Sequence, residues 1–152
     1  MFKNKCLVLW RHAEAVDGSP DHARELTQKG RQQAQRMAEW LNARLPADTL
    51  VLVSPAVRAQ QTAKALKRSF TTCNAIDTGA DSATLLKTVG EFGAETTLVV
   101  GHQPTLGHVA SRLLTGAEGA LSVKKGAVWW ITVRSDRREL AALQAVMTPE
   151  LL

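Results

Sequence analysis

Two histidines and two arginines near the ends of apolar runs are the residues of this sequence that could act on a phosphoryl group. His12 and Arg11 directly follow one apolar run, His102 follows another, and Arg58 lies shortly after a third. A neutral imidazole can attack phosphorus and form a covalent phosphohistidine. Guanidinium groups bind phosphoryl oxygens through paired N–H donors. The set therefore predicts phosphoryl transfer through a histidine nucleophile.

The elements that must position these residues form an alternating pattern of apolar runs and helical repeats, which indicates an α/β protein. We expect strands at 5–10, 50–53, 72–76 and 97–100, and a closing hairpin of 127–134 and 139–147 that turns around 135–136. We expect helices from the N-cap Thr27 to Arg44, from Pro55 at the first position to Lys67, at 83–92 and at 104–116. The prediction is one three-layer α/β/α domain over residues 1–152, whose mainly parallel sheet carries an antiparallel strand.

This pattern brings the candidate residues to one edge of the sheet. The carboxyl ends of parallel strands face the same side, and ligands of open α/β sheets bind beyond that edge. Arg11, His12, Arg58 and His102 are therefore expected to converge on one crevice. The helix that opens near Pro104 would add free N–H groups at the same place. The crevice is expected to bind an anion, for which a phosphoryl group is the best match.

Four segments, in this order, resemble the motifs of the histidine phosphatase superfamily. They are LWRHAE at 9–14, LTQKGRQQA at 26–34, SPAVRAQQTA at 54–63 and VGHQP at 100–104. The first resembles the RHG motif in its RHA form, with Ala13 in place of glycine. In length the chain is similar to the small phosphohistidine phosphatases of the SixA type. The resemblance implies a fold like that of phosphoglycerate mutases.

Carried onto this sequence, the resemblance implies that His12 is the nucleophile. It places Arg11, Arg58 and His102 in the phosphate pocket, which agrees with the reading from strand ends and charge. Arg24, just before the second motif, could contact the substrate or remain on the surface.

The general acid has no clear motif in this sequence. The candidates are Glu14, near the nucleophile, and Asp77 and Asp81, after the third expected strand. Cleaving a phosphate ester at neutral pH normally requires a placed acid, because the leaving alkoxide must be protonated. The imidazole of a phosphohistidine departs more readily. The sequence therefore favours phosphohistidine as the substrate.

Composition limits the other function classes. The 152-residue chain has 45% hydrophobic and 22% charged residues, a formal charge of +5 and two cysteines. Its basic residues are spread over several segments without a nucleic-acid-binding signature. No apolar run is long enough to cross a membrane, and the sequence contains neither a Walker A loop nor metal-ligand spacing. We expect a cytoplasmic protein that needs no cofactor or metal and binds neither nucleic acid nor membranes.

Three functions remain open from the sequence. The first is a phosphatase for phosphohistidine on signalling proteins, such as histidine phosphotransfer domains. The second is a phosphatase or mutase for a small phosphorylated metabolite. The third is a phosphate-binding module without turnover. The oligomeric state is not predicted.

Overall fold

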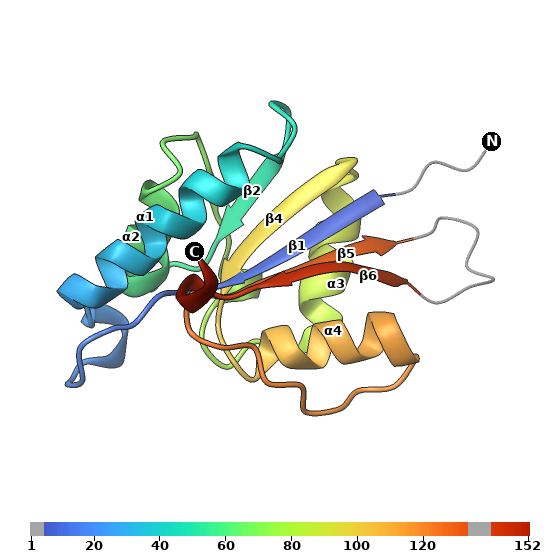
Figure 1. Ribbon diagram of the computed structural model, residues 1–152. Coiled ribbons are helices and arrows are strands. Elements are labelled where there is room, and N and C mark those ends of the chain that lie inside the picture. The colour runs from blue at the N-terminus through green and yellow to red at the C-terminus, as the bar shows by residue number, and fades with distance from the viewer. Residues whose placement is uncertain (1–4, 134–140) are drawn as a thin grey trace.

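The computed structural model describes residues 5–133 and 141–152, which form a six-stranded sheet covered by helices on both faces (Figure 1). The sheet order is β3-β2-β4-β1-β5-β6. Its strands are β1 (Lys5–Arg11), β2 (Leu50–Val53), β3 (Thr71–Thr72), β4 (Thr96–Gly101), β5 (Val128–Val133) and β6 (Ala142–Met147). The strands β1 to β4 pair in parallel, and β5 and β6 are antiparallel. The predicted mainly parallel α/β/α architecture is confirmed.

Helices α1 (Gln28–Asn42) and α2 (Val57–Lys64) cover one face of the sheet, and α3 (Ser82–Phe92) and α4 (Thr105–Thr115) cover the other (Figure 1). Strand residues alternate between the two cores, as the period of two requires. Val8 and Trp10 pack in the core under α1 and α2, whereas Leu7 and Leu9 pack in the core under α3 and α4. Both faces of the central strands are buried, which explains their continuous apolar runs.

The connections create a crevice between β1 and β4. These two strands are neighbours, with Arg11 opposite Gly101 at their carboxyl ends. The chain leaves β1 toward α1 on one face and leaves β4 toward α4 on the other face. Such a topological switch point leaves the strand ends open between two diverging loops. This is where the sequence places His12 and His102.

Local signals explain where the helices begin and end. Thr27 caps α1 as predicted, because its hydroxyl accepts a hydrogen bond from the backbone N–H of Gly30 at 2.9 Å. The prediction that Pro55 starts α2 is wrong, since the helix begins at Val57. Ala56 is still extended there, and its N–H donates to the Ser54 hydroxyl at 3.2 Å.

The expected strand at 72–76 is also wrong beyond its first residue. Strand β3 pairs with β2 at Thr71 and Thr72 only, and residues Asn74–Ile76 form a 3₁₀ helix. That turn carries Ile76 into the core, where its side chain is 2% exposed. The expected turn at 135–136, and the expected strand positions 134, 139 and 140, lie outside the described residues.

Candidate active site

A polar cavity of about 340 Å³ lies at the carboxyl ends of β1 and β4. It is lined by Arg11, His12, Ala15, Asp17, Asp21, Arg24, Arg58, Thr78, His102, Gln103 and Lys125. The structure thus brings together all four residues predicted from the strand ends. Arg24, for which the sequence left both a substrate contact and a surface role open, also lines this cavity. The floor is buried, because His12, Arg58 and His102 are only 7%, 4% and 4% exposed.

His12 is held as a neutral ring with one unprotonated nitrogen, Nε2, which accepts a hydrogen bond from Arg58 at 3.4 Å. Its Nδ1 lies 2.8 Å from the carbonyl oxygen of Ala13. A carbonyl oxygen only accepts, so we assign the ring hydrogen to Nδ1. Burial is the main cause that lowers the pKa of His12 from 6.5 to about 3, and the nearby His102, Arg58 and Arg11 lower it further. At neutral pH the lone pair of Nε2 is therefore unprotonated.

His102 lies beside His12, with ring centroids 5.1 Å apart. Its Nε2 is 2.7 Å from the hydroxyl oxygen of Ser54, which already accepts from the backbone N–H of Ala56. We infer that the Ser54 hydroxyl donates to Nε2, which leaves the ring hydrogen of His102 on Nδ1. Burial and Arg58 lower the pKa of His102 to about 4, so the ring is neutral. Its Nδ1 is buried and has no hydrogen-bond partner among the described residues.

Arg58 has all three nitrogen positions directed at groups of the site. Its Nε is 3.4 Å from His12 Nε2, its Nη1 donates to the backbone oxygen of Asp21 at 2.8 Å, and its Nη2 pairs with the Asp21 carboxylate at 3.1 Å. Arg24 holds the same carboxylate through its Nε at 3.0 Å. Those two arginines lower the pKa of Asp21. The Asp21 carboxylate therefore occupies a guanidinium fork that can bind an anion.

Arg11 is a second guanidinium at the strand end. Its Nη1 donates to the backbone oxygen of Val123 at 2.9 Å, and its Nε is buried without a partner in the described part of the chain. Burial, and then the charge of Arg58, lower the pKa of Arg11 from its usual range. The cavity therefore suits an anionic ligand. Such a ligand would reduce the repulsion between the two guanidiniums and would accept from the ring N–H inferred for His102, which has no partner among the described residues.

None of the three predicted acid candidates lines the cavity. The carboxylate of Glu14 accepts from the Thr27 hydroxyl at 2.8 Å, at the start of α1. Asp77 accepts from His22 at 2.6 Å and from the backbone of Thr78 at 2.7 Å. Asp81 caps α3, where the bond from the backbone of Thr84 lowers its pKa. Each carboxylate is bound elsewhere, so its predicted role gains no support from its position.

The expectation of several free N–H groups at the start of α4 is corrected as well. The N–H of Leu106 donates to the carbonyl of His102 at 3.0 Å. The N–H of Gly107 donates to the side chain of Gln103 at 2.7 Å. The positive end of the helix still faces the crevice, but these two donors are already used. Charge at the site must come mainly from the arginines.

Asp21 and Lys125 are cavity residues that the sequence analysis missed. Asp21 stands three positions before Arg24 in a polar stretch, a spacing that also suits the observed ion pair on a 3₁₀ turn. Lys125 stands in the turn before β5, far along the chain from the motifs. No local pattern distinguishes either residue from an ordinary surface charge.

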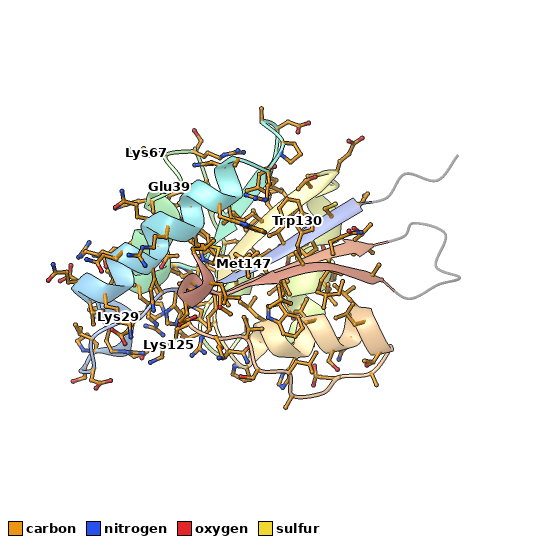
Figure 2. All side chains as sticks on the ribbon, viewed as in Figure 1. Lys29, Glu39, Lys67, Lys125, Trp130 and Met147 are labelled. Atoms are coloured by element: carbon orange, nitrogen blue, oxygen red, sulfur yellow. The ribbon has the colours of Figure 1, made fainter. Side chains whose placement is uncertain are left out.

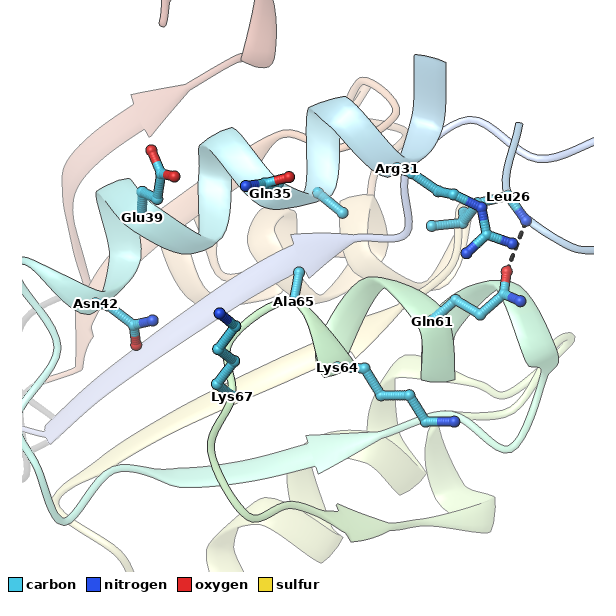
Figure 3. Close-up of a pocket in the computed structure, with 10 residues that line it drawn as sticks. Leu26, Arg31, Gln35, Glu39, Asn42, Gln61, Lys64, Ala65 and Lys67 are labelled. Atoms are coloured by element: carbon cyan, nitrogen blue, oxygen red, sulfur yellow. Dashed lines mark hydrogen bonds between the residues drawn. The ribbon is translucent and has the colours of Figure 1, made fainter. Parts of the chain in front are cut away.

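A larger cavity of about 580 Å³ lies between α1 and α2, away from the histidines (Figure 3). Figure 3 shows Gln61 at one end of it, where its amide oxygen accepts from the backbone of Leu26 at 2.8 Å. Its other lining residues are mostly long surface side chains, among them Arg31, Lys64 and Lys67. None of the described residues that line it is a histidine, cysteine, serine or threonine, so the smaller cavity is the candidate active site.

Comparison with known proteins agrees with this geometry. Residues 7–79 match the sequence model of the histidine phosphatase superfamily (branch 1). The uncharacterized protein Rv1276c of Mycobacterium tuberculosis (strain H37Rv) is 34% identical over 127 residues, which cover 74% of this chain and 75% of that protein. Phosphohistidine phosphatase SixA of Escherichia coli (strain K12) is 31% identical over 123 residues, covering 72% of this chain and 74% of that protein.

Among solved structures, the protein histidine phosphatase SixA complexed with tungstate has a TM-score of 0.82 at 24% identity, with 96% of this chain and 98% of that chain covered. The match confirms the phosphoglycerate-mutase-like fold that the motifs implied. Among the described residues, no helix is both long and apolar enough to cross a membrane.

Proposed function

Because the chain belongs to the histidine phosphatase superfamily, we propose that it is a metal-independent phosphatase that removes phosphoryl groups from histidine side chains of signalling proteins. The observation that carries the proposal is the neutral His12, whose unprotonated Nε2 lies among Arg11, Arg58 and His102. We propose a cytoplasmic location, in which the free thiols of Cys6 and Cys73 stay reduced.

In the first proposed step, Nε2 of His12 attacks the phosphorus atom of the bound substrate. The bond from phosphorus to the leaving group breaks, and its electron pair leaves with that group. A phosphohistidine substrate departs as neutral imidazole when its other ring nitrogen carries a proton. The His12 ring becomes positively charged, and its Nδ1–H, which donates to the Ala13 carbonyl, stabilises that charge.

In the second step, water attacks the phosphorus atom of the phosphorylated His12. The bond from phosphorus to Nε2 breaks, its electron pair returns to the ring, and a proton of the water goes to phosphate or solvent. Arg11, Arg58 and the Nδ1–H of His102 would stabilise the equatorial oxygens in both steps. The Asp21 carboxylate must leave the Arg58 fork when a phosphoryl group enters.

The test compares the wild-type chain with His12→Ala and His108→Ala. His108 lies on α4 outside the cavity and serves as the matched control. The substrates are a histidine phosphotransfer domain phosphorylated on histidine, p-nitrophenyl phosphate and phosphoserine. We expect His12→Ala to abolish turnover, His108→Ala to retain it, and the phosphohistidine protein to give the highest kcat/KM.

Wild-type enzyme denatured at alkaline pH during turnover should carry a phosphoryl group that later acid treatment releases and that is absent from His12→Ala. Appreciable turnover by His12→Ala would refute the covalent mechanism. Efficient hydrolysis of phosphoserine with none of the phosphohistidine protein would favour a small phosphorylated metabolite as the substrate. Phosphate binding with no turnover of any substrate would indicate a binding module.

A further inference from the structure

Lys125 is an exposed cation at the rim of the catalytic cavity. Figure 2 labels it near the end of the sheet where β1 and β4 finish. The phosphate-binding floor is buried, whereas Lys125 is open to solvent. Lys125 makes no hydrogen bond or ion pair with any described residue, unlike Arg24 and Arg58 of the same cavity. Its charge is therefore available to a ligand.

The backbone around Lys125 is fixed to the nucleophile strand. The N–H of Gly126 donates to the carbonyl of His12 at 3.1 Å, and the carbonyl of Gly126 accepts from the indole of Trp10 at 3.1 Å. The N–H of Ala127 closes the turn onto the carbonyl of Lys124 at 2.9 Å. These hydrogen bonds fix the position of the Lys125 backbone relative to His12. Only the side chain of Lys125 can then move relative to the cavity.

The neighbouring Lys124 provides a contrast within the same turn. It is equally exposed but does not line the cavity. Glu150 lies in the C-terminal 3₁₀ helix next to α1, where a hydrogen bond from its own backbone is the main cause that lowers its pKa and the charge of Lys124 lowers it further. Lys124 therefore has Glu150 as an acidic neighbour, whereas Lys125 faces the cavity and forms no ion pair with Asp17 or Asp21, the two aspartates that also line it.

We propose that Lys125 binds a second anionic group of the substrate, a carboxylate on the leaving-group side of the phosphoryl group. The inference rests on the proposed phosphatase function and adds a specificity determinant to it. The half-buried Arg11 and the buried Arg58 and His102 would bind the phosphoryl oxygens, so a cation at the exposed rim meets the part of the substrate beyond them. That carboxylate can belong to an acidic side chain beside a phosphohistidine or to a small carboxylated phosphate ester.

A binding experiment tests this without turnover. Calorimetry would measure Kd for phenylphosphonate and para-carboxyphenylphosphonate with the wild-type chain, Lys125→Gln and Lys124→Gln. We expect the wild type and Lys124→Gln to bind the carboxylated ligand about fivefold more tightly, the upper range for an exposed ion pair. Lys125→Gln should lose that preference. The readout is the ratio of the two Kd values, which cancels any general effect of charge on phosphonate binding.

If Lys125→Gln raised Kd for both ligands by the same factor, the proposal would be overturned, because Lys125 would then contact the phosphonate group itself. The same ratio in all three proteins would also overturn it. Failure of the proposed function looks different, because the wild type would then hydrolyse no phosphorylated substrate.

A second arm distinguishes the two sources of the carboxylate. Phosphohistidine peptides with Glu or Gln next to the phosphohistidine would be compared by kcat/KM with phenyl phosphate and para-carboxyphenyl phosphate. A Lys125-dependent preference for the Glu peptide assigns the carboxylate to a protein substrate. If Lys125 causes a preference only between the two aryl phosphates, the carboxylate is assigned to a small molecule. If neither pair shows a Lys125-dependent preference, the proposal is contradicted.

Discussion

At the scale of single residues, the neutral state of the two histidines is the property on which the proposed catalysis depends. Both rings would normally titrate near pH 6.5. Burial and the neighbouring arginines lower the pKa of His12 to about 3 and that of His102 to about 4. A histidine that stays unprotonated below pH 6 could attack phosphorus even beside two guanidiniums, which are always charged.

The first prediction is that these two rings resist protonation. In an NMR titration of the ring nitrogens, both should remain neutral down to about pH 5, whereas in denaturant they should titrate near 6.5. Since the unfolded state binds these protons more tightly, the free energy of unfolding should be greatest above pH 6.5 and fall as the pH decreases toward 4. Each ring would contribute about 1–3 kcal/mol to that loss at pH 4.5.

Single variants provide the control for this pH dependence. In His12→Asn or His102→Asn, the slope of unfolding free energy against pH between 6.5 and 4.5 should become shallower. An unchanged slope in both variants, or ring titration near 6.5 in the folded protein, would contradict the assigned protonation states.

The second prediction concerns the shape of the Arg58 side chain. Arg58→Lys should lower kcat/KM roughly 100-fold, because a lysine supplies a point charge and cannot form the three directed contacts of the guanidinium. Arg68→Lys is the matched control, since Arg68 also donates from its guanidinium to the fold, at Asn42, Leu45 and Pro46, but lies outside the cavity. Steady-state kinetics with p-nitrophenyl phosphate would measure both. Near-normal kcat/KM for Arg58→Lys would remove Arg58 from the phosphate site.

At the scale of elements, the segment that leaves β1 is fixed against the start of α1. A Cβ placed on Gly30 would lie 2.0 Å from the carbonyl oxygen of Glu14. That carbonyl also accepts from the N–H of Thr27 at 3.0 Å. The glycine of the second motif is therefore required by close packing against the segment that follows His12, not by turn conformation.

The third prediction follows from this contact. Gly30→Ala should lower the free energy of unfolding by about 1–3 kcal/mol and reduce kcat, because Glu14 must move away and His12 lies two residues before it. Gly90→Ala is the control, since a Cβ there meets nothing within 4 Å on helix α3. That change should stabilise the protein by up to about 1 kcal/mol. Urea denaturation would measure both, and equal effects of the two substitutions would contradict the packing argument.

At the scale of the whole molecule, the cavity joins segments from most of the chain. Its lining comes from the end of β1, the loop before α1, helix α2, the loop before α3, the start of α4 and the turn before β5. The contact between Gly126 and His12 spans 114 residues of sequence. An anion bound there would connect both helical layers through the sheet edge.

The fourth prediction is that tungstate or inorganic phosphate stabilises the folded chain. At a concentration 100 times Kd, the gain should be about 2.7 kcal/mol, because the ligand binds only the folded state. Thermal unfolding monitored by calorimetry would show a Tm that rises with ligand concentration in the wild type and rises less in Arg58→Lys. A Tm that sodium chloride of equal ionic strength raises as much would reveal a general salt effect instead.

The sequence by itself determined the strands and helices that carry the site and the residues at their ends. Apolar runs bounded by Arg11-His12, Ser54 and Gly101-His102 are local signals, and buried strands in a parallel sheet must be apolar on both faces. Because parallel strands share a carboxyl edge, four distant residues could be predicted to meet. The N-cap Thr27 could also be predicted, because capping depends on residues that are neighbours in the sequence.

Only the tertiary structure decided which other charges belong to the site. Asp21, Glu14, Asp77 and Lys125 look alike in sequence, as polar residues of loops. Hydrogen bonds to partners far along the chain direct Asp21 to Arg58 and Asp77 to His22, and the turn bound to His12 brings Lys125 to the rim. The pKa values of the histidines were also beyond the sequence, because desolvation depends on burial by both helical layers and not on neighbouring residues.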